Sequence, residues 1–215
     1  MKKITLLALL TVMASCKDVE DKIKEAAITA KTSTTMVEEE AAKTPLDSAA
    51  VEKAMQEYMT PGEMHKTLAM DNGVWEEDIT MWMAPGAKPL KGKATVTSRM
   101  ILGGRYQEMT HKGLFMGMPF EGICTLGYDN AAKKMVSSWV DNMGTGIMYM
   151  TGDYNGLSKT VEFKGEVTDP ITKKVKPSRE LFTMVDDNTR KMEMFDVMPD
   201  GKEYKSMEIT MIRKK

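Results

Sequence analysis

From residue 74 onward, apolar and polar residues alternate in short segments that turn residues separate. A period of two places successive side chains on opposite faces of a strand, and regularly spaced turns are typical of an antiparallel sandwich or barrel. Sequential hairpins favour an up-and-down barrel, because closure removes both exposed edges. The pattern predicts a mainly β fold of ten strands over residues 74–83, 90–102, 105–116, 120–128, 134–141, 147–154, 160–167, 179–185, 191–197 and 203–212.

A helical segment precedes these strands. Apolar residues recur at helical spacing after Asp47, which can cap a helix, and the pattern stops at Pro61. A second short helix is expected over residues 63–70. We therefore expect one or two short helices within residues 47–72 and a barrel domain over residues 73–215.

Methionine is the unusual feature of the composition, with 23 residues against 5 Phe and 3 Trp. Methionine is a flexible and polarizable filler of irregular apolar spaces. In the strands with the clearest alternation, the apolar face is expected to point inward, and it carries Ile79, Met81, Met83, Val161, Phe163, Val167, Phe182, Met184, Met192, Met194, Met207, Ile209 and Met211. Two interpretations stay open: these side chains form a packed core, or they form an adaptable lining around a ligand cavity.

The middle strands leave the inner face undecided. One set of faces carries polar residues, namely Arg105, Gln107, Met109 and His111, then Glu121, Ile123 and Thr125, then Ser137, Trp139 and Asp141. If these faces point inward, the barrel encloses a guanidinium, an imidazole and two carboxylates, which must be paired or must meet a polar ligand. Alternatively these faces are solvated, and the opposite faces fill the core with Tyr106, Phe120, Cys124, Leu126, Val136 and Val140.

The start of the chain has the pattern of an export signal. Two lysines precede an apolar stretch over residues 4–13, which is too short to span a bilayer. The stretch ends Val12-Met13-Ala14-Ser15-Cys16, which resembles a bacterial lipobox. We expect a signal over residues 1–16, a lipid anchor on Cys16, a solvated tether over residues 17–46 and a place in the bacterial envelope as an outer-membrane lipoprotein, periplasmic or surface-exposed. The alternative is an ordinary cleavable signal.

Charge and motifs narrow the classes of function. The 30 basic and 31 acidic residues give a net charge of -1, which disfavours a nucleic-acid partner. Neither of the 2 histidines has metal-ligand spacing, and the sequence contains no phosphate-binding glycine loop and no Gly-x-Ser-x-Gly motif. We expect no metal and no cofactor. Cys124 lies in a strand-like apolar run, which favours a buried, inert thiol over a nucleophile.

Gly92 and four later segments form a distinctive series: Leu102-Gly103-Gly104-Arg105-Tyr106, Gly117-Met118-Pro119-Phe120-Glu121-Gly122, Gly127-Tyr128-Asp129-Asn130 and Ser138-Trp139-Val140-Asp141-Asn142-Met143-Gly144-Thr145-Gly146. The series resembles the DUF1579 family of uncharacterised bacterial proteins. The resemblance implies a calycin-like barrel with an internal cavity, and it implies no established activity. Related haem-binding nitrobindin barrels use a histidine near the end of the chain, whereas no histidine follows His111 here.

These observations favour a lipid-anchored envelope protein that binds a small apolar or amphipathic ligand in the barrel. The alternatives are a hydrolase or isomerase acting at the barrel mouth through Asp141, Glu121 or His111, and an interaction module with a filled barrel. The candidate ligand-binding residues are Arg105, His111, Glu121, Trp139, Asp141, Met81, Met192, Met194 and Met207.

Overall fold

The computed structural model describes residues 47–198 and 200–215. The lipobox, Cys16 and the tether therefore lie outside the described residues. Contacts divide the chain into two units, Met1–Lys53 and Ala54–Lys215, and the second unit contains the whole barrel. Among the described residues, no helix is both long enough and apolar enough to cross a membrane.

Two helices precede the barrel, as predicted. Helix α2 spans Ser48–Met59, and the carboxylate of Asp47 accepts a hydrogen bond from the Ala49 N–H at 3.1 Å near its start. Helix α3 spans Glu63–Ala69 and contacts three strands of the barrel, Leu90–Ile101, Tyr106–Phe115 and Met118–Asp129. Its buried side chain Leu68 joins the hydrophobic core. The imidazole of His65 accepts a hydrogen bond from the Gly62 N–H at 3.0 Å, which fixes the first turn of α3.

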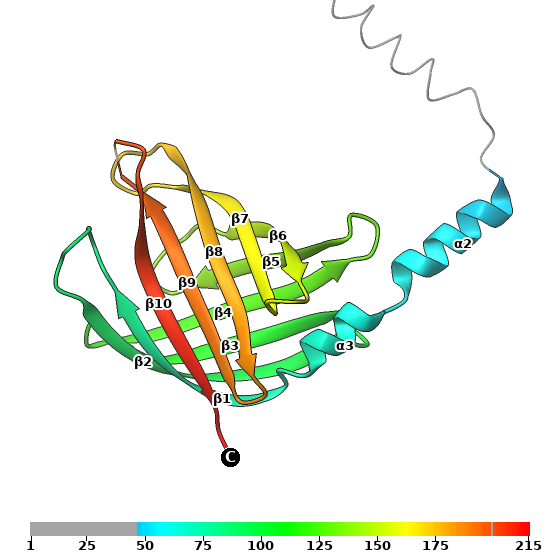
Figure 1. Cartoon of the computed structure of the whole chain (residues 1–215), viewed down its shortest axis with the longest axis horizontal. Helices are drawn as coiled ribbons and strands as arrows, with labels where there is room; N and C mark the ends of the chain where they lie inside the picture. Colours follow the sequence, from blue (N-terminus) through cyan, green and yellow to red (C-terminus); the bar gives the residue numbers. More distant parts are fainter. Residues whose placement is uncertain (1–46, 199) are drawn as a thin grey trace, which may run out of the picture. The chain divides into compact units, whose positions relative to one another are not determined.

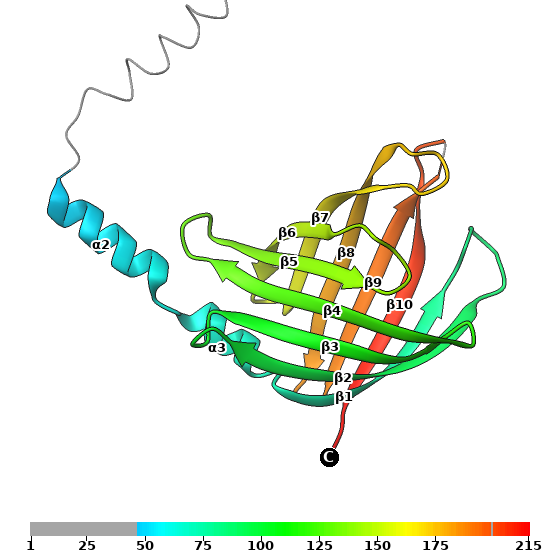
Figure 2. The ribbon, with the colours of Figure 1, turned by 180° about the vertical axis from the view of Figure 1, so that it is seen from behind.

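The barrel has ten antiparallel strands and is closed, which confirms the predicted fold class (Figures 1 and 2). Each strand pairs with the next along the chain, and β1 pairs with β10. The strands are β1 Gly73–Met81, β2 Leu90–Ile101, β3 Tyr106–Phe115, β4 Met118–Asp129, β5 Lys134–Asp141, β6 Met148–Asn155, β7 Thr160–Thr168, β8 Val175–Asp186, β9 Thr189–Val197 and β10 Glu203–Arg213.

The end of the barrel next to α3, which we call the closed end, contains buried polar side chains that bond to one another and to the backbone. The carboxylate of Asp71 lies 2.5 Å from the Arg190 guanidinium, and the exposed fractions of these side chains are only 5% and 2%. The indole N–H of Trp75 donates to the Asp71 carbonyl at 2.9 Å, and the Gln107 amide donates to the Leu68 carbonyl at 2.5 Å. These bonds tie the segment after α3 to the barrel wall.

The hydrophobic core lies inside the barrel and contains several methionines. Its buried members are Leu68, Trp75, Ile79, Ala94, Val96, Met109, Cys124, Leu126, Met135, Met150, Val161, Phe163, Phe182, Ile209 and Met211. Flexible methionine side chains therefore fill part of the barrel interior, as the alternation predicts.

Candidate functional site

The barrel encloses a cavity of about 350 Å³. It reaches the end opposite α3, where Phe115 ends β3, Phe120 lies near the start of β4, and Met143 follows β5. Eight methionines line it: Met81, Met109, Met143, Met148, Met192, Met194, Met207 and Met211. Aromatic rings from Phe115, Phe120, Trp139, Phe163 and Phe182 complete an apolar lining. The four methionines predicted as site residues, Met81, Met192, Met194 and Met207, all face this cavity.

Met83 does not belong to the lining, contrary to the prediction from alternation. Strand β1 ends at Met81, and the Met83 side chain lies in the following connection with an exposed fraction of 69%. Its backbone carbonyl instead accepts a hydrogen bond from the Tyr204 hydroxyl at 3.4 Å.

In β3 the odd-numbered face points inward, and it carries Gln107, Met109 and His111. Arg105 precedes the strand, in the connection from β2, and its side chain is exposed. The guanidinium of Arg105 donates to the Met59 carbonyl at 2.7 Å. The prediction that Arg105 is a cavity anchor is therefore wrong, because Arg105 lies in the turn between β2 and β3, at the closed end of the barrel.

In β4 the even-numbered face points inward, so Gly122, Cys124 and Leu126 are buried. Glu121 lies on the outer face, where its carboxylate pairs with Lys112 at 2.8 Å. The structure thus corrects the expectation that Glu121 faces the cavity. The two faces of this strand are similarly apolar in sequence, since the outer face carries the exposed Ile123.

In β5 the inner face carries Trp139 and Asp141, both of which line the cavity. The indole N–H of Trp139 donates to Asp141 Oδ2 at 2.6 Å. Asp141 Oδ1 accepts from the backbone N–H groups of Met143 at 2.8 Å and Gly144 at 3.1 Å. Asp141 therefore orients the indole and holds the turn that follows β5.

The Trp139 ring is packed on several sides. It stacks on Phe120 with ring centroids 6.2 Å apart, and the His111 ring meets it edge-on at 5.0 Å. Gly122 makes this position available, because a Cβ atom added there would lie 2.5 Å from the indole. A side chain at residue 122 would therefore displace a wall of the cavity.

His111 pairs with an acid that the sequence analysis did not select. Its Nδ1 lies 3.2 Å from Oε2 of Glu77, and the exposed fractions of the two side chains are 8% and 2%. His111 Nε2 is buried and has no hydrogen-bond partner among the residues that the structure describes. Both residues line the cavity, so the imidazole presents one satisfied and one unsatisfied nitrogen there.

Glu180 is the second acid that the sequence analysis missed. It lies on β8 between Phe163 of β7 and Met194 of β9, and it lines the cavity. The side chain is half-buried, its remaining surface faces the cavity, and no hydrogen bond or ion pair of this carboxyl is found among the described residues. Burial among apolar side chains raises the pKa of Glu180 to about 7.

Cys124 is buried, as predicted. Its sulfur lies 3.7 Å from the Ser137 hydroxyl. Burial raises the pKa of the Cys124 thiol to about 12, with further contributions from the carboxylates of Glu180 and Glu77. A thiol with this pKa has almost no thiolate at neutral pH, so it is not a nucleophile. Cys124 lines the same cavity as these two acids.

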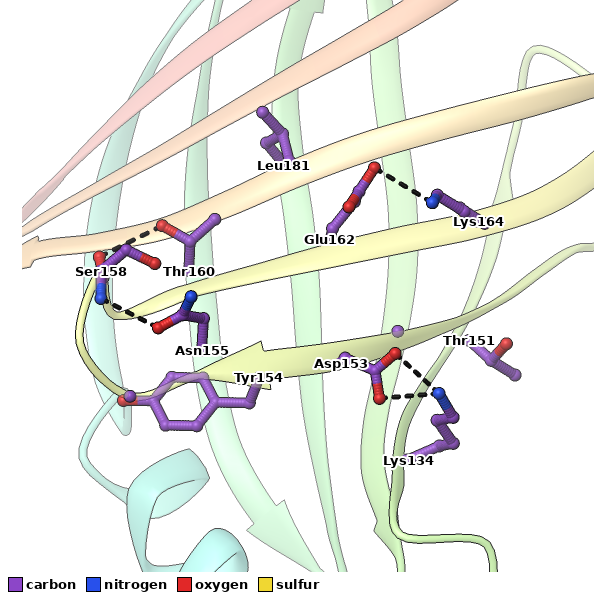
Figure 3. A pocket seen from close by; sticks show the side chains of 12 residues that line it. Lys134, Thr151, Asp153, Tyr154, Asn155, Ser158, Thr160, Glu162, Lys164 and Leu181 are labelled. Carbon is purple, nitrogen blue, oxygen red and sulfur yellow. Dashed lines mark hydrogen bonds and ion pairs between the residues drawn. The ribbon is translucent and has the colours of Figure 1, made fainter.

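The outside of the barrel has a second hollow, of about 770 Å³, along β6 and β7 (Figure 3). Its charged side chains are paired with one another: Lys134 lies 2.6 Å from Asp153, and Lys164 lies 3.3 Å from Glu162. This hollow is open to solvent, and its charges are already compensated. The internal cavity is therefore the better candidate site.

In the described part of the chain, no group of three or more His, Cys, Asp or Glu side chains has an arrangement that could hold a metal ion.

The sequence contained a signal for the two missed acids, Glu77 and Glu180. Glu77 shares a face with Ile79 and Met81, and Glu180 shares one with Phe182 and Met184. Strict alternation predicts an inward carboxyl at both positions.

Comparison with known proteins agrees with this architecture. Residues 60–213 match the model of a family described as a protein of unknown function, DUF1579. The chain belongs to the DUF1579 family. The match covers the whole barrel of this DUF1579 protein and begins just before α3. No curated protein matches the chain.

One solved structure supports the fold, and it supports the fold alone. The DUF1579 barrel is similar to Rv2717c from M. tuberculosis, with a TM-score of 0.55 and 12% sequence identity over 73% of this chain and 100% of that chain. A redesigned β-barrel also matches, with a TM-score of 0.37 and 12% identity over 72% of this chain and 100% of that chain. Identities this low do not transfer a ligand or an activity.

Proposed function

We propose that this DUF1579 barrel binds a small apolar or amphipathic molecule in its internal cavity. The observation that carries the proposal is the methionine-lined cavity of about 350 Å³, which contains a carboxyl without a partner. This volume lies at the lower end of the range of about 300–1,000 Å³ for small-molecule sites. A cavity of this volume speaks against the alternative of a filled barrel.

The character of the lining supports an apolar ligand. Unbranched methionine side chains change rotamer easily and adapt to ligands of different shape. Aromatic rings toward the end of the barrel opposite α3, including Phe115, Phe120 and Trp139, add rigid apolar surface. The few polar groups that face the cavity can fix the orientation of a ligand.

Binding is favoured over catalysis by the state of the predicted catalytic groups. Both oxygens of Asp141 already accept hydrogen bonds, and Glu121 lies outside the barrel. The thiol of Cys124 is protonated at neutral pH because of its raised pKa. Of the three residues of the enzyme hypothesis, His111 and Asp141 line the cavity, whereas Glu121 does not.

A fluorescence assay tests the proposed function. We expect the uncharged dye N-phenyl-1-naphthylamine to increase its emission on binding to the cavity. Met192→Trp should reduce the affinity by about tenfold or more, because a larger side chain fills the cavity. Met83→Trp is the matched control, since Met83 is exposed outside the cavity. Absence of dye binding, or equal affinities of the two variants, would contradict the proposal.

The cellular address is a second part of the proposal. The lipobox ending at Cys16 supports a diacylated protein in the bacterial envelope, and two or three acyl chains anchor stably. Cys16→Ala should release the protein from the membrane fraction, whereas Cys124→Ala should leave it there. Membrane association that survives Cys16→Ala would refute the lipid anchor.

A further inference from the structure

The charged groups that face the cavity are almost all acidic. Carboxyl groups reach it from three separate walls, Glu77 on β1, Asp141 on β5 and Glu180 on β8. His111 on β3 is the one basic side chain in the lining, which contains no lysine and no arginine. Fixed negative charge in a cavity surrounded by apolar groups favours a cationic ligand group.

Within residues 47–198 and 200–215, only one of these carboxyl groups lacks a partner. Glu77 contacts the His111 imidazole at 3.2 Å, and Asp141 accepts hydrogen bonds from Trp139 and the following turn. Glu180 has neither a hydrogen-bond donor nor a cation in the part of the chain that the structure describes, although burial of an unpaired carboxylate is costly. A carboxyl that is left unpaired beside an open cavity has room for a partner from outside the chain.

A second acceptor faces the same cavity. His111 is buried, and its Nε2 has no partner. When Nδ1–H donates to Glu77, the lone pair of Nε2 can accept a hydrogen bond. The lining therefore provides unpaired acceptors from β8 and β3, strands on opposite sides of the ten-strand ring.

We propose that the cavity selects amphipathic amines, with the apolar part of the ligand among the methionines and the ammonium group paired with Glu180. The inference rests on the proposed function and specifies the class of its ligand. An ammonium group carries three N–H donors and no acceptor, so it complements a lining that offers acceptors. A carboxylate or phosphate headgroup would instead meet like charges from three walls.

The lining also suits the part of the ligand next to the ammonium group. The indole of Trp139 and the ring of Phe163 line the cavity, and aromatic faces attract cations. Hydrogen bonds between ionised groups are about twice as strong as those between neutral groups. The Glu180 pair thus supplies selectivity, and the apolar lining supplies the remaining affinity.

Protonation links the binding of an amine to pH. The titratable groups that face Glu180 across the cavity are Glu77, His111, Cys124 and Asp141. The raised pKa of Glu180 means that an ammonium ligand, which pairs with the ionised carboxylate, must displace a proton near neutral pH. We expect tighter amine binding at pH 8 than at pH 5.5, and no such difference for an alcohol.

Three probes with the same chain separate the possible headgroups: decylamine, decan-1-ol and decanoate. Each would displace N-phenyl-1-naphthylamine at pH 8, below its micelle concentration. We expect decylamine to bind about tenfold or more tightly than decan-1-ol, and decanoate to bind least tightly. If the dye binds but decylamine is no better than decan-1-ol, the amine proposal fails and the proposed function stands. If neither the dye nor any probe binds, both fail.

Glu180→Gln tests the assigned anchor, since it keeps the shape and removes the charge. The affinity for decylamine should fall about tenfold or more, and the affinity for decan-1-ol should stay within about twofold. Glu166→Gln is the matched control, because Glu166 is exposed on the outer face of β7. An unchanged decylamine affinity in Glu180→Gln, or an equal loss for the amine and the alcohol, would overturn the assignment.

Discussion

Two acidic residues, Asp71 and Glu180, differ in whether the protein provides a partner for the carboxyl group. Asp71 at the closed end lies 2.5 Å from Arg190, and both side chains are almost fully buried. Glu180 faces the cavity with no partner among the described residues. The Arg190 guanidinium also lies over Trp75, 5.1 Å from the ring centroid, so the partners of Asp71 are themselves held in place.

The difference separates two uses of a charge inside a protein. A carboxylate whose partners come from the same chain fixes structure, as Asp71 does between the segment after α3 and the barrel wall. A carboxyl that faces a cavity alone reduces stability in its ionised form. The ionised carboxylate of Glu180 destabilises the ligand-free barrel in this way. A cationic ligand that pairs with Glu180 would offset this destabilisation.

Breaking the pair at the closed end should have the largest effect. Asp71→Asn leaves the buried Arg190 guanidinium without its anion, so we expect a loss of about 3–5 kcal/mol in the free energy of unfolding. Urea denaturation followed by tryptophan fluorescence measures it. A loss below about 1 kcal/mol would show that Asp71 does not hold this end.

Removing the unpaired charge should have the opposite sign. The pKa of Glu180 is raised from 4.5 to about 7 in the folded protein, so folding favours the protonated form. The contribution of Glu180 to the stability of the wild type should therefore fall as the pH rises from about 4.5 to about 7, and then level off. Glu180→Gln should raise the free energy of unfolding by up to about 3 kcal/mol at pH 8 and leave it unchanged at pH 4. A variant less stable than the wild type at pH 8 would refute this explanation.

Substitutions at Gly152 and Gly122 should differ in their cost to stability, because Gly152 packs against backbone and Gly122 packs against a side chain that lines the cavity. A Cβ atom added to Gly152 would lie 2.5 Å from the backbone carbonyl of Glu162, whereas one added to Gly122 would lie 2.5 Å from the Trp139 ring. The ring can move into the cavity and the backbone cannot. We expect Gly152→Ala to cost about 1–3 kcal/mol, and Gly122→Ala to cost less while weakening dye binding. Equal costs with unchanged dye binding would contradict the cavity geometry.

The exterior pair should have the smallest effect. Glu121 and Lys112 lie 2.8 Å apart, and their side chains are more than half exposed, at 55% and 66%. Glu121→Gln should change the free energy of unfolding by less than about 1 kcal/mol and leave dye binding unchanged. A tenfold loss of dye affinity would mean that Glu121 contributes to the site after all.

The strand pattern was largely predictable from the sequence, because alternation and turn residues act locally. The eighth strand is the clearest exception, since it begins at Val175 instead of residue 179. Pro177 pairs with Glu166 of β7, while pairing with β9 begins only at Arg179. Proline has no backbone N–H to donate. It is tolerated in this part of β8, which pairs with β7 and has no neighbouring strand on the other side.

The site was only partly predictable. His111, Trp139, Asp141 and the four methionines lie where alternation can place them, but the inner face of β4 depends on Gly122. A glycine has no side chain whose polarity reveals the face on which it lies, so the sequence pattern could not exclude Glu121. The sequence also does not show which charged side chains form ion pairs. Asp71 and Arg190 are distant in the chain, and the folded barrel is needed to see that they pair and that Glu180 has no such partner among the described residues.

A titration of Glu180 tests the central claim most directly. Carbon-13 NMR of side-chain carboxyl groups, assigned by comparison with Glu180→Gln, would follow its ionisation from pH 4 to pH 9. We expect a pKa near 7 in the ligand-free protein, as burial without a partner requires, and a lower value with decylamine. A ligand-free pKa near the ordinary value of 4.5, unchanged by decylamine, would contradict the unpaired carboxyl and the ligand assigned to it.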